Sequence, residues 1–122
     1  MQQRLERLSD HHLEAWTPAI DVYETEASFV VTAEVPGLSR EQVDLAFEHT
    51  RLTIRGHRSD RGAAADIVGF HQVERGYGSF ARTFEFANSI DVEHVTADLA
   101  DGVLTITLPK VQALPARKIH VQ

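Results

Sequence analysis

The chain has 122 residues, a formal net charge of −6, 43% hydrophobic residues and 25% charged residues. This length suits one domain, and the composition is ordinary for a soluble globular protein. The acidic balance disfavours a phosphate backbone as a partner, so we expect no nucleic-acid binding. Without cysteine, the chain has no disulfide, thiolate metal site or cysteine nucleophile. No apolar run is long enough for a membrane span, and the polar start is unlike a secretory signal. We therefore expect a cytoplasmic protein.

The first segment has the hydrophobic period of a helix. Residues at three- and four-residue steps are Leu5, Leu8, His12 and Trp16, with charged residues between them. Pro18 keeps a helix over Gln2 to Trp16 from continuing much further. Because an isolated helix of this length is not stable, we expect residues 1–16 to form a short arm that needs a partner surface.

From Pro18 onward the hydrophobic period changes to two residues, which is the period of a β-strand. Seven runs alternate in this way, over residues 20–23, 29–35, 43–48, 51–55, 80–86, 95–99 and 104–108. Turn signals divide them, among them Pro36-Gly37 and the tight turn Asp101-Gly102, and Glu48-His49-Thr50 is short enough for a hairpin. Short alternating runs divided by turns predict an all-β sandwich in which each strand turns one face to the core.

Two segments break this pattern. His57 to Ile67 is long, polar and rich in alanine and glycine, and a weak strand over Gly69 to Glu74 follows it. Long connections of this kind are usually functional or disordered. After Pro109, Lys110 to Lys118 reads as an extended linker that ends in Ile119-His120-Val121. We therefore place one domain over residues 17–109 and a C-terminal extension over residues 110–122.

One short motif has the spacing of a nucleotide-binding loop. Gly76 to Ala81 matches G-x-G-x-x-A, but such a loop must open a helix whose N-terminus holds the phosphates. Here it opens an alternating run that contains three phenylalanines, which favours the flexible start of a strand. The chain has no G-x-x-x-x-G-K-[ST] loop either, so we expect no ATP site and no cofactor.

Candidate metal ligands and catalytic groups are scattered. The histidines are His11, His12, His49, His57, His71, His94 and His120. None pairs with another at ligand spacing and no H-E-x-x-H motif occurs, so we expect solvated histidines and no metal site. His71 is a pH-sensitive contact if it lies in an interface. With no G-x-S-x-G motif and no specified acid–base pair, we expect no enzyme.

Arg82 is unusual because alternation places it on the same face as Phe80, Phe84 and Phe86. A buried guanidinium without partners for its donors costs several kcal/mol. Two interpretations stay open at this point. Arg82 lies at a sheet edge and extends its charge to water, or it forms a charge pair across a subunit interface.

The tail also has two interpretations. Ile119 and Val121 are two residues apart on a tether, so they can add to a sheet edge and place both side chains in a groove. Alternatively, they belong to a frayed terminus or to a last strand of the chain's own sheet.

Five ordered motifs resemble the small heat-shock protein family and its alpha-crystallin domain, in the bacterial form. They are Pro18 to Glu24 with Ala33 to Leu38, Leu52 to Gly56, Glu74 to Arg82, Ala97 to Leu108 with the signature around Asp101-Gly102-Val103-Leu104, and Ile119 to Val121. The resemblance extends over residues 16–122. It implies an immunoglobulin-like antiparallel β-sandwich that acts as an ATP-independent holding chaperone for unfolding proteins.

The resemblance also implies a homodimer formed by strand exchange, in which Gly69 to Glu74 pairs with the partner's Ile20 to Tyr23 strand. Arg82 falls at the family's dimer-supporting arginine, which favours the interface interpretation. The implied dimer-interface residues are Ile20, Val22, Tyr23, Phe70, His71, Val73 and Arg82.

The tail resembles the family's C-terminal anchor, so Ile119 and Val121 would dock in an apolar groove of another dimer and build larger oligomers. The implied groove residues are Val43, Leu45, Phe47, Val95, Ala97 and Leu99. The same apolar surface would bind unfolding clients. The alternative is a binding module of similar shape, a co-chaperone that docks on an ATP-driven partner; the anchor and the long loop favour the holding chaperone.

Overall fold

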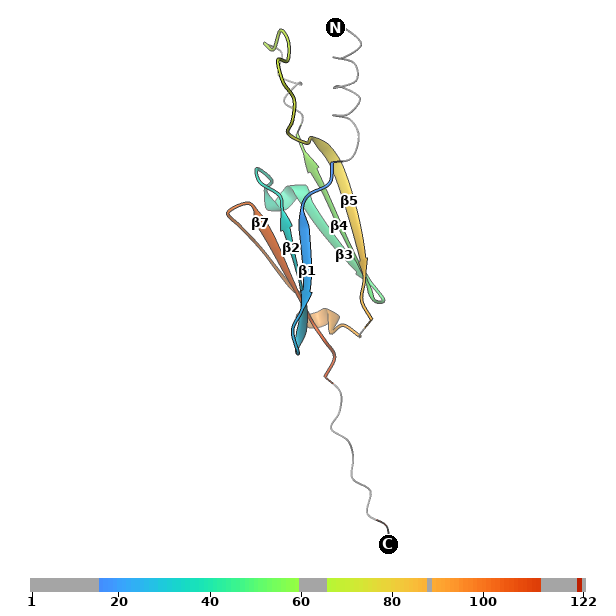
Figure 1. The fold of residues 1–122 in the computed structure, drawn as a ribbon. Coiled ribbons are helices and arrows are strands. Elements are labelled where there is room, and N and C mark those ends of the chain that lie inside the picture. Colours follow the sequence, from blue (N-terminus) through green and yellow to red (C-terminus); the bar gives the residue numbers. More distant parts are fainter. Residues whose placement is uncertain (1–15, 60–65, 88, 113–120, 122) are drawn as a thin grey trace.

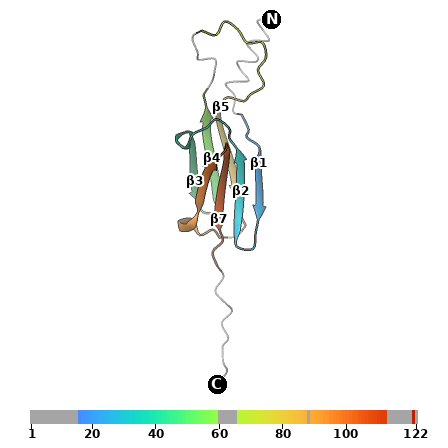
Figure 2. The ribbon, with the colours of Figure 1, turned by 90° about the vertical axis from the view of Figure 1, so that its left-hand side faces the viewer.

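The computed structural model describes residues 16–59, 66–87, 89–112 and 121. Within these residues the chain forms two antiparallel sheets that pack face to face (Figures 1 and 2). The first sheet has the order β1 (Ile20–Glu24), β2 (Ser28–Glu34), β7 (Val103–Pro109) and β6 (Thr96–Ala100). The second has the order β3 (Val43–Glu48), β4 (Arg51–Arg58) and β5 (Gly78–Glu85). The predicted all-β sandwich is confirmed.

The core lies between the two sheets and follows the predicted alternation. The largest fully buried side chains are Leu52, Ile54, Ile106, Leu108, Val31 and Val35. They come from both sheets, and the strand residues among them lie on the face that each strand turns to the opposite sheet. Each of these side chains removes apolar area from water, which is the main favourable contribution to folding.

The turns agree with the expected ones in position and geometry. Asp101 and Gly102 join β6 to β7 with φ values of 53° and 76°, the left-handed backbone that an Asp-Gly hairpin requires. His49, between β3 and β4, has a φ of 58°. Two short 3-10 helices lie between strands: η1 (Arg40–Gln42) precedes β3, and η3 (Val92–His94) precedes β6.

Two expectations about the long connection differ from the structure. The sequence predicts that the connection begins at His57, but β4 continues to Arg58 because His57 and Arg58 pair with Ser79 and Gly78. The weak strand expected over residues 69–74 is not formed in the single chain, where these residues run irregularly. A strand needs a neighbour to bond with, and no described strand of the same chain runs beside this segment.

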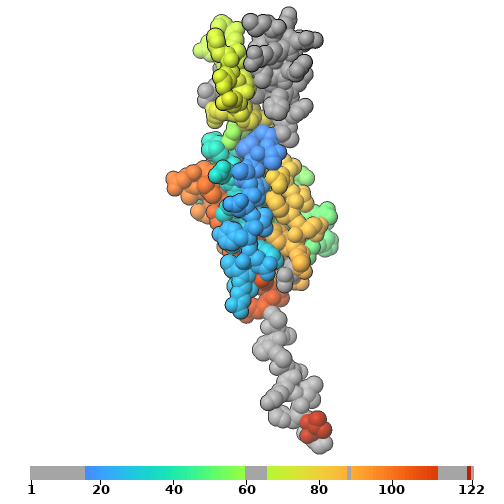
Figure 3. Space-filling view, viewed as in Figure 1, coloured from blue at the N-terminus to red at the C-terminus, as the bar shows by residue number. Residues whose placement is uncertain are grey.

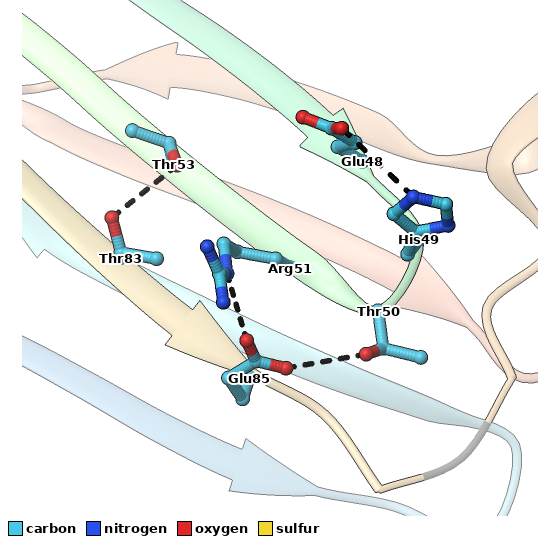
Figure 4. A network of polar contacts seen from close by, with 7 residues as sticks. All are labelled: Glu48, His49, Thr50, Arg51, Thr53, Thr83 and Glu85. Carbon is cyan, nitrogen blue, oxygen red and sulfur yellow. Dashed lines mark hydrogen bonds and ion pairs between the residues drawn. The ribbon is translucent and has the colours of Figure 1, made fainter.

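The outer face of the second sheet carries a polar network near the β3–β4 turn (Figure 4). Arg51 Nε donates to Glu85 Oε1 at 2.7 Å, and the hydroxyl of Thr50 donates to Glu85 Oε2 at 3.2 Å. The hydrogen bond from Arg51 lowers the pKa of the Glu85 carboxyl. The contribution of the Arg51–Glu85 pair to the stability of the fold is therefore present at neutral pH, and it is lost as the pH falls through the lowered pKa of Glu85. Because both side chains are exposed, this contribution is small.

Candidate functional site

One row of inward-facing side chains across the middle of the sandwich shows which parts of the space between the sheets are covered and which are exposed to solvent. In the first sheet the row is Val22, Val31, Ile106 and Ala97, and in the second it is Arg82, Ile54 and Leu45. Directly paired residues point to the same face, so all of these side chains face the space between the sheets. The central ones are fully buried, whereas the ends of the row are exposed or half-buried. The sandwich is therefore open along two edges.

The first open edge is formed by β1 and β5, which run side by side on the surface (Figure 3). Val22 is 44% exposed and Tyr23 is 51% exposed, while Ile20 packs partly against the core. Arg82 is half-buried on the neighbouring strand. The structure thus brings four of the predicted dimer-interface residues to one edge. Within the described part of the chain, no strand neighbours the outer side of β1.

The other three predicted interface residues lie away from this edge. Phe70, His71 and Val73 belong to the connection between β4 and β5, which extends beyond the end of the sandwich (Figure 1). There the connection forms a half-open pocket of about 430 Å³ lined by its own residues, including these three. Within one chain the predicted interface is therefore in two parts, and the pairing of the connection with a second copy stays a prediction.

Arg82 has few contacts for a half-buried charge. Its Cζ lies 5.3 Å from the ring centroid of Phe84, which is a cation–π arrangement. Among the described residues, no ion pair or hydrogen bond to its guanidinium is formed. The prediction that Arg82 points inward is confirmed, because it lies on the same face of β5 as Phe80, which is buried, and Phe84, which is half-buried like Arg82. Both interpretations of Arg82 remain compatible with this geometry.

The second open edge is formed by β3 and β6 and carries all six predicted groove residues. Val43, Phe47, Val95 and Leu99 pack partly against the core. Between them, Leu45 is 37% exposed and Ala97 is exposed. We call these six residues the apolar edge. Of the predicted anchor, Val121 is 97% exposed, and Ile119 lies outside the described residues.

The sequence reasoning missed a cluster around Trp16 and Arg58. The indole Nε1 of Trp16 donates to the carbonyl of Gly78 at 3.0 Å, and its ring meets Phe80 edge-on with centroids 5.0 Å apart. The Cζ of Arg58 lies 4.1 Å from the indole centroid. We call Trp16, Arg58 and the backbone at Gly76 and Gly78 the Trp16 clamp. The available signal was the chain's single tryptophan close to Pro18, but the helical period of the first segment predicts that Trp16 belongs to the arm.

Arg58 also bonds two backbone carbonyls that are distant in sequence. Its Nη1 donates to Gly76 at 3.0 Å, and its Nη2 donates to Pro36 at 2.8 Å. Burial lowers the pKa of the Arg58 guanidinium, and the charge of Arg75 lowers it further. These contacts join the end of β4, the start of β5 and the turn after β2.

Comparison with known proteins identifies the family of this chain. Residues 21–122 match the model of the Hsp20/alpha crystallin family. The chain belongs to this family. It is 35% identical to small heat shock protein C4 of Rickettsia felis over 86% of this chain and 64% of that protein. It is 34% identical to spore protein SP21 of Stigmatella aurantiaca over 88% of this chain and 63% of that protein. The chain thus spans just under two thirds of these two relatives.

Solved structures of Hsp20 relatives share the fold. A small heat-shock protein from Xylella fastidiosa superposes with a TM-score of 0.77 at 33% identity, covering 89% of this chain and 99% of that one. Heat shock protein 16.0 from Schizosaccharomyces pombe superposes with a TM-score of 0.74 at 32% identity, covering 88% and 99%. The immunoglobulin-like alpha-crystallin sandwich expected from the sequence motifs is confirmed.

In this Hsp20 chain, the G-x-G-x-x-A motif starts a strand. Gly78 is the first residue of β5, and the carbonyls of Gly76 and Gly78 accept the bonds of the Trp16 clamp. No helix follows whose N-terminus could hold a phosphate, so the nucleotide-loop alternative is wrong. Among the described residues, no helix is long and apolar enough to cross a membrane, and no group of three potential metal ligands occurs.

Proposed function

We propose that this chain is an ATP-independent holding chaperone that binds unfolding proteins under stress and suppresses their aggregation. The observation that carries the proposal is the apolar edge, where Leu45 and Ala97 are uncovered between residues that pack on the core. Exposed apolar surface of this kind binds apolar segments of other chains. Several of the relatives are named heat shock proteins, which supports a role under stress. A cytoplasmic location stays a prediction.

The proposed unit is a homodimer formed by strand exchange. Among the described residues no strand lies on the outer side of β1, so this side can accept a strand, and residues 69–74 of the projecting connection form no strand. Adding a strand to the outer side of β1 supplies the backbone hydrogen bonds that an edge strand lacks on that side. In this proposal residues 1–16 form the arm, residues 17–109 the domain, and residues 110–122 the extension that links dimers into larger oligomers.

Chaperone activity is tested by heating a thermolabile enzyme with and without the protein in the absence of ATP. We expect stoichiometric amounts to reduce the light scattering of the aggregating enzyme strongly, because exposed apolar segments are bound as they appear. Serum albumin at the same mass concentration is the control. Scattering equal to that of the albumin sample would contradict the proposed function.

A charge on the apolar edge is expected to block docking of the tail. We predict that Leu45→Glu reduces the fraction of assemblies larger than a dimer by about tenfold or more, because an unpaired carboxylate in an apolar groove costs more than 1.4 kcal/mol. Light scattering coupled to size exclusion gives the mass distribution. Ala46→Glu is the matched control, since the neighbouring Ala46 is exposed on the opposite face of β3. Equal distributions for the two variants would rule out this groove.

A further inference from the structure

We propose that the Trp16 clamp couples the segment that enters the sandwich to the connection that pairs with a second copy. Docking of Trp16 and formation of the dimer then stabilise each other. The inference rests on the proposed strand-exchanged dimer and adds a regulatory contact to it. It assigns roles to two residues, Trp16 and Arg58, that lie outside the predicted interface.

The first step is the position of Arg58. It is the last residue of β4, where the connection leaves the sandwich, and Gly76 and Gly78 mark where the connection returns. The bond from Nη1 to the Gly76 carbonyl joins these two points across 18 residues. Arg58 therefore fixes both ends of the segment that contains Phe70, His71 and Val73.

The second step is the dependence of Arg58 on Trp16. The guanidinium lies against the indole ring at 4.1 Å, and its Nε is buried without a hydrogen-bond partner in the described structure. Two backbone carbonyls and the indole face are thus what hold the group in place. A cation over an indole gains most when water is excluded, so removing the ring exposes the guanidinium and weakens its hold on Gly76.

The third step is a direct contact between Trp16 and the returning chain. A Cβ at position 76 would lie 2.7 Å from the Cβ of Trp16, so the backbone passes too close for any residue except glycine. The indole also holds the Gly78 carbonyl by a hydrogen bond. Undocking of Trp16 therefore releases the start of β5 as well as the guanidinium at the end of β4.

Coupling follows from the cost of ordering the connection. Residues 66–77 have none of the described strands of their own chain beside them, and they must take up a strand conformation to add to a partner's β1. A segment whose two ends are already fixed loses less conformational freedom on binding. By linkage, whatever strengthens dimer formation must equally favour docking of Trp16.

The experiment uses the full chain, whose fluorescence comes from a single tryptophan. Samples are diluted through the range in which dimers dissociate, with mass measured by sedimentation and Trp16 emission measured on the same samples. We expect emission to shift to the red with the same midpoint as the loss of mass.

We expect Arg58→Gln to raise the dimer Kd by about tenfold, within the usual range of coupling between sites. Trp16→Phe, which keeps a ring and loses the Nε1–H donor, should raise the Kd by less.

Arg51→Gln is the matched control, because Arg51 lies on the same strand and its charge pairs with Glu85 on the exposed outer face. Its Kd should equal that of the parent chain. Constant Trp16 emission across dimer dissociation would overturn the coupling while leaving the dimer and the chaperone function intact. An unchanged Kd in both Arg58→Gln and Trp16→Phe would overturn it too. A chain that is monomeric at every concentration would instead remove the proposed dimer, and the coupling with it.

Discussion

Gly56→Ala is expected to lower the free energy of unfolding by about 2–3 kcal/mol, a cost typical of overpacking a dense core. Gly56 lies on the core face of β4, directly opposite Phe80 on β5. An added Cβ would overlap Cε1 of Phe80, lie 2.5 Å from its Cζ and lie 3.2 Å from the Gln42 carbonyl oxygen. The ring has little room to move, because Phe80 is 3% exposed and contacts Trp16.

Thermal and urea unfolding at one protein concentration would measure the effect of Gly56→Ala. A loss of this size lowers Tm by about 10 °C or more in a domain of this length. Gly69→Ala is the matched control, since nothing lies within 4 Å of a Cβ at position 69 in the single chain. Both variants are compared at a concentration at which the chain is monomeric, because Gly69 belongs to the segment proposed to pair with a second copy. Its stability should stay within about 0.5 kcal/mol of the parent chain. Equal midpoints for the two alanine variants would show that the Phe80 ring does not rest on Gly56.

The fold could be predicted from the sequence because its strongest signals are local. Alternation of apolar and polar residues places Val31, Ile54 and Ile106 on the inward faces, and all three are fully buried. Asp101-Gly102 requires a left-handed backbone and therefore marked its hairpin. Each of these predictions needed only residues close together in the chain.

The features that the sequence reasoning missed depend on contacts between distant residues. Arg58 belongs to a strand only because Gly78 pairs with it, and its side chain bonds Pro36 and Gly76. Trp16 donates to Gly78, 62 residues away. A polar residue followed by a long Ala/Gly-rich stretch reads as a loop, and nothing local shows that a distant strand extends it.

The candidate site was predicted in part, and for a different reason. Alternation supplied the inward direction of Arg82 and Leu45, but it does not tell which strands lie at sheet edges. The family resemblance predicted which strands lie at the edges of the two sheets. The strand order confirms that β1, β5, β3 and β6 are edge strands. The proposed occupants of those edges are other chains, which neither the sequence pattern nor a single chain can specify.

Arg82→Ala is expected to weaken the proposed dimer by about 2 kcal/mol, or about thirtyfold in Kd. Arg82 is half-buried between Phe80 and Phe84 at the β1–β5 edge, and among the described residues its donors have no hydrogen-bond acceptor. A second copy that covers this edge must supply acceptors, because a guanidinium buried without them would oppose association. Truncating the side chain removes those bonds and leaves their partner groups unpaired.

Sedimentation over a concentration series gives the Kd, and unfolding measured on the same samples shows whether the sandwich remains intact. We expect it to remain intact, because Arg82 lies at the end of its row and Ile54, its neighbour on β4, stays covered by the opposite sheet. Arg55→Ala is the matched control: it removes the same charge from the exposed outer face of β4. If Arg82→Ala and Arg55→Ala give the same Kd as the parent chain, Arg82 extends its charge to water at the edge and the interface interpretation is wrong. A rise in Kd confined to Arg82→Ala requires that its inward-facing charge is bonded by a second copy.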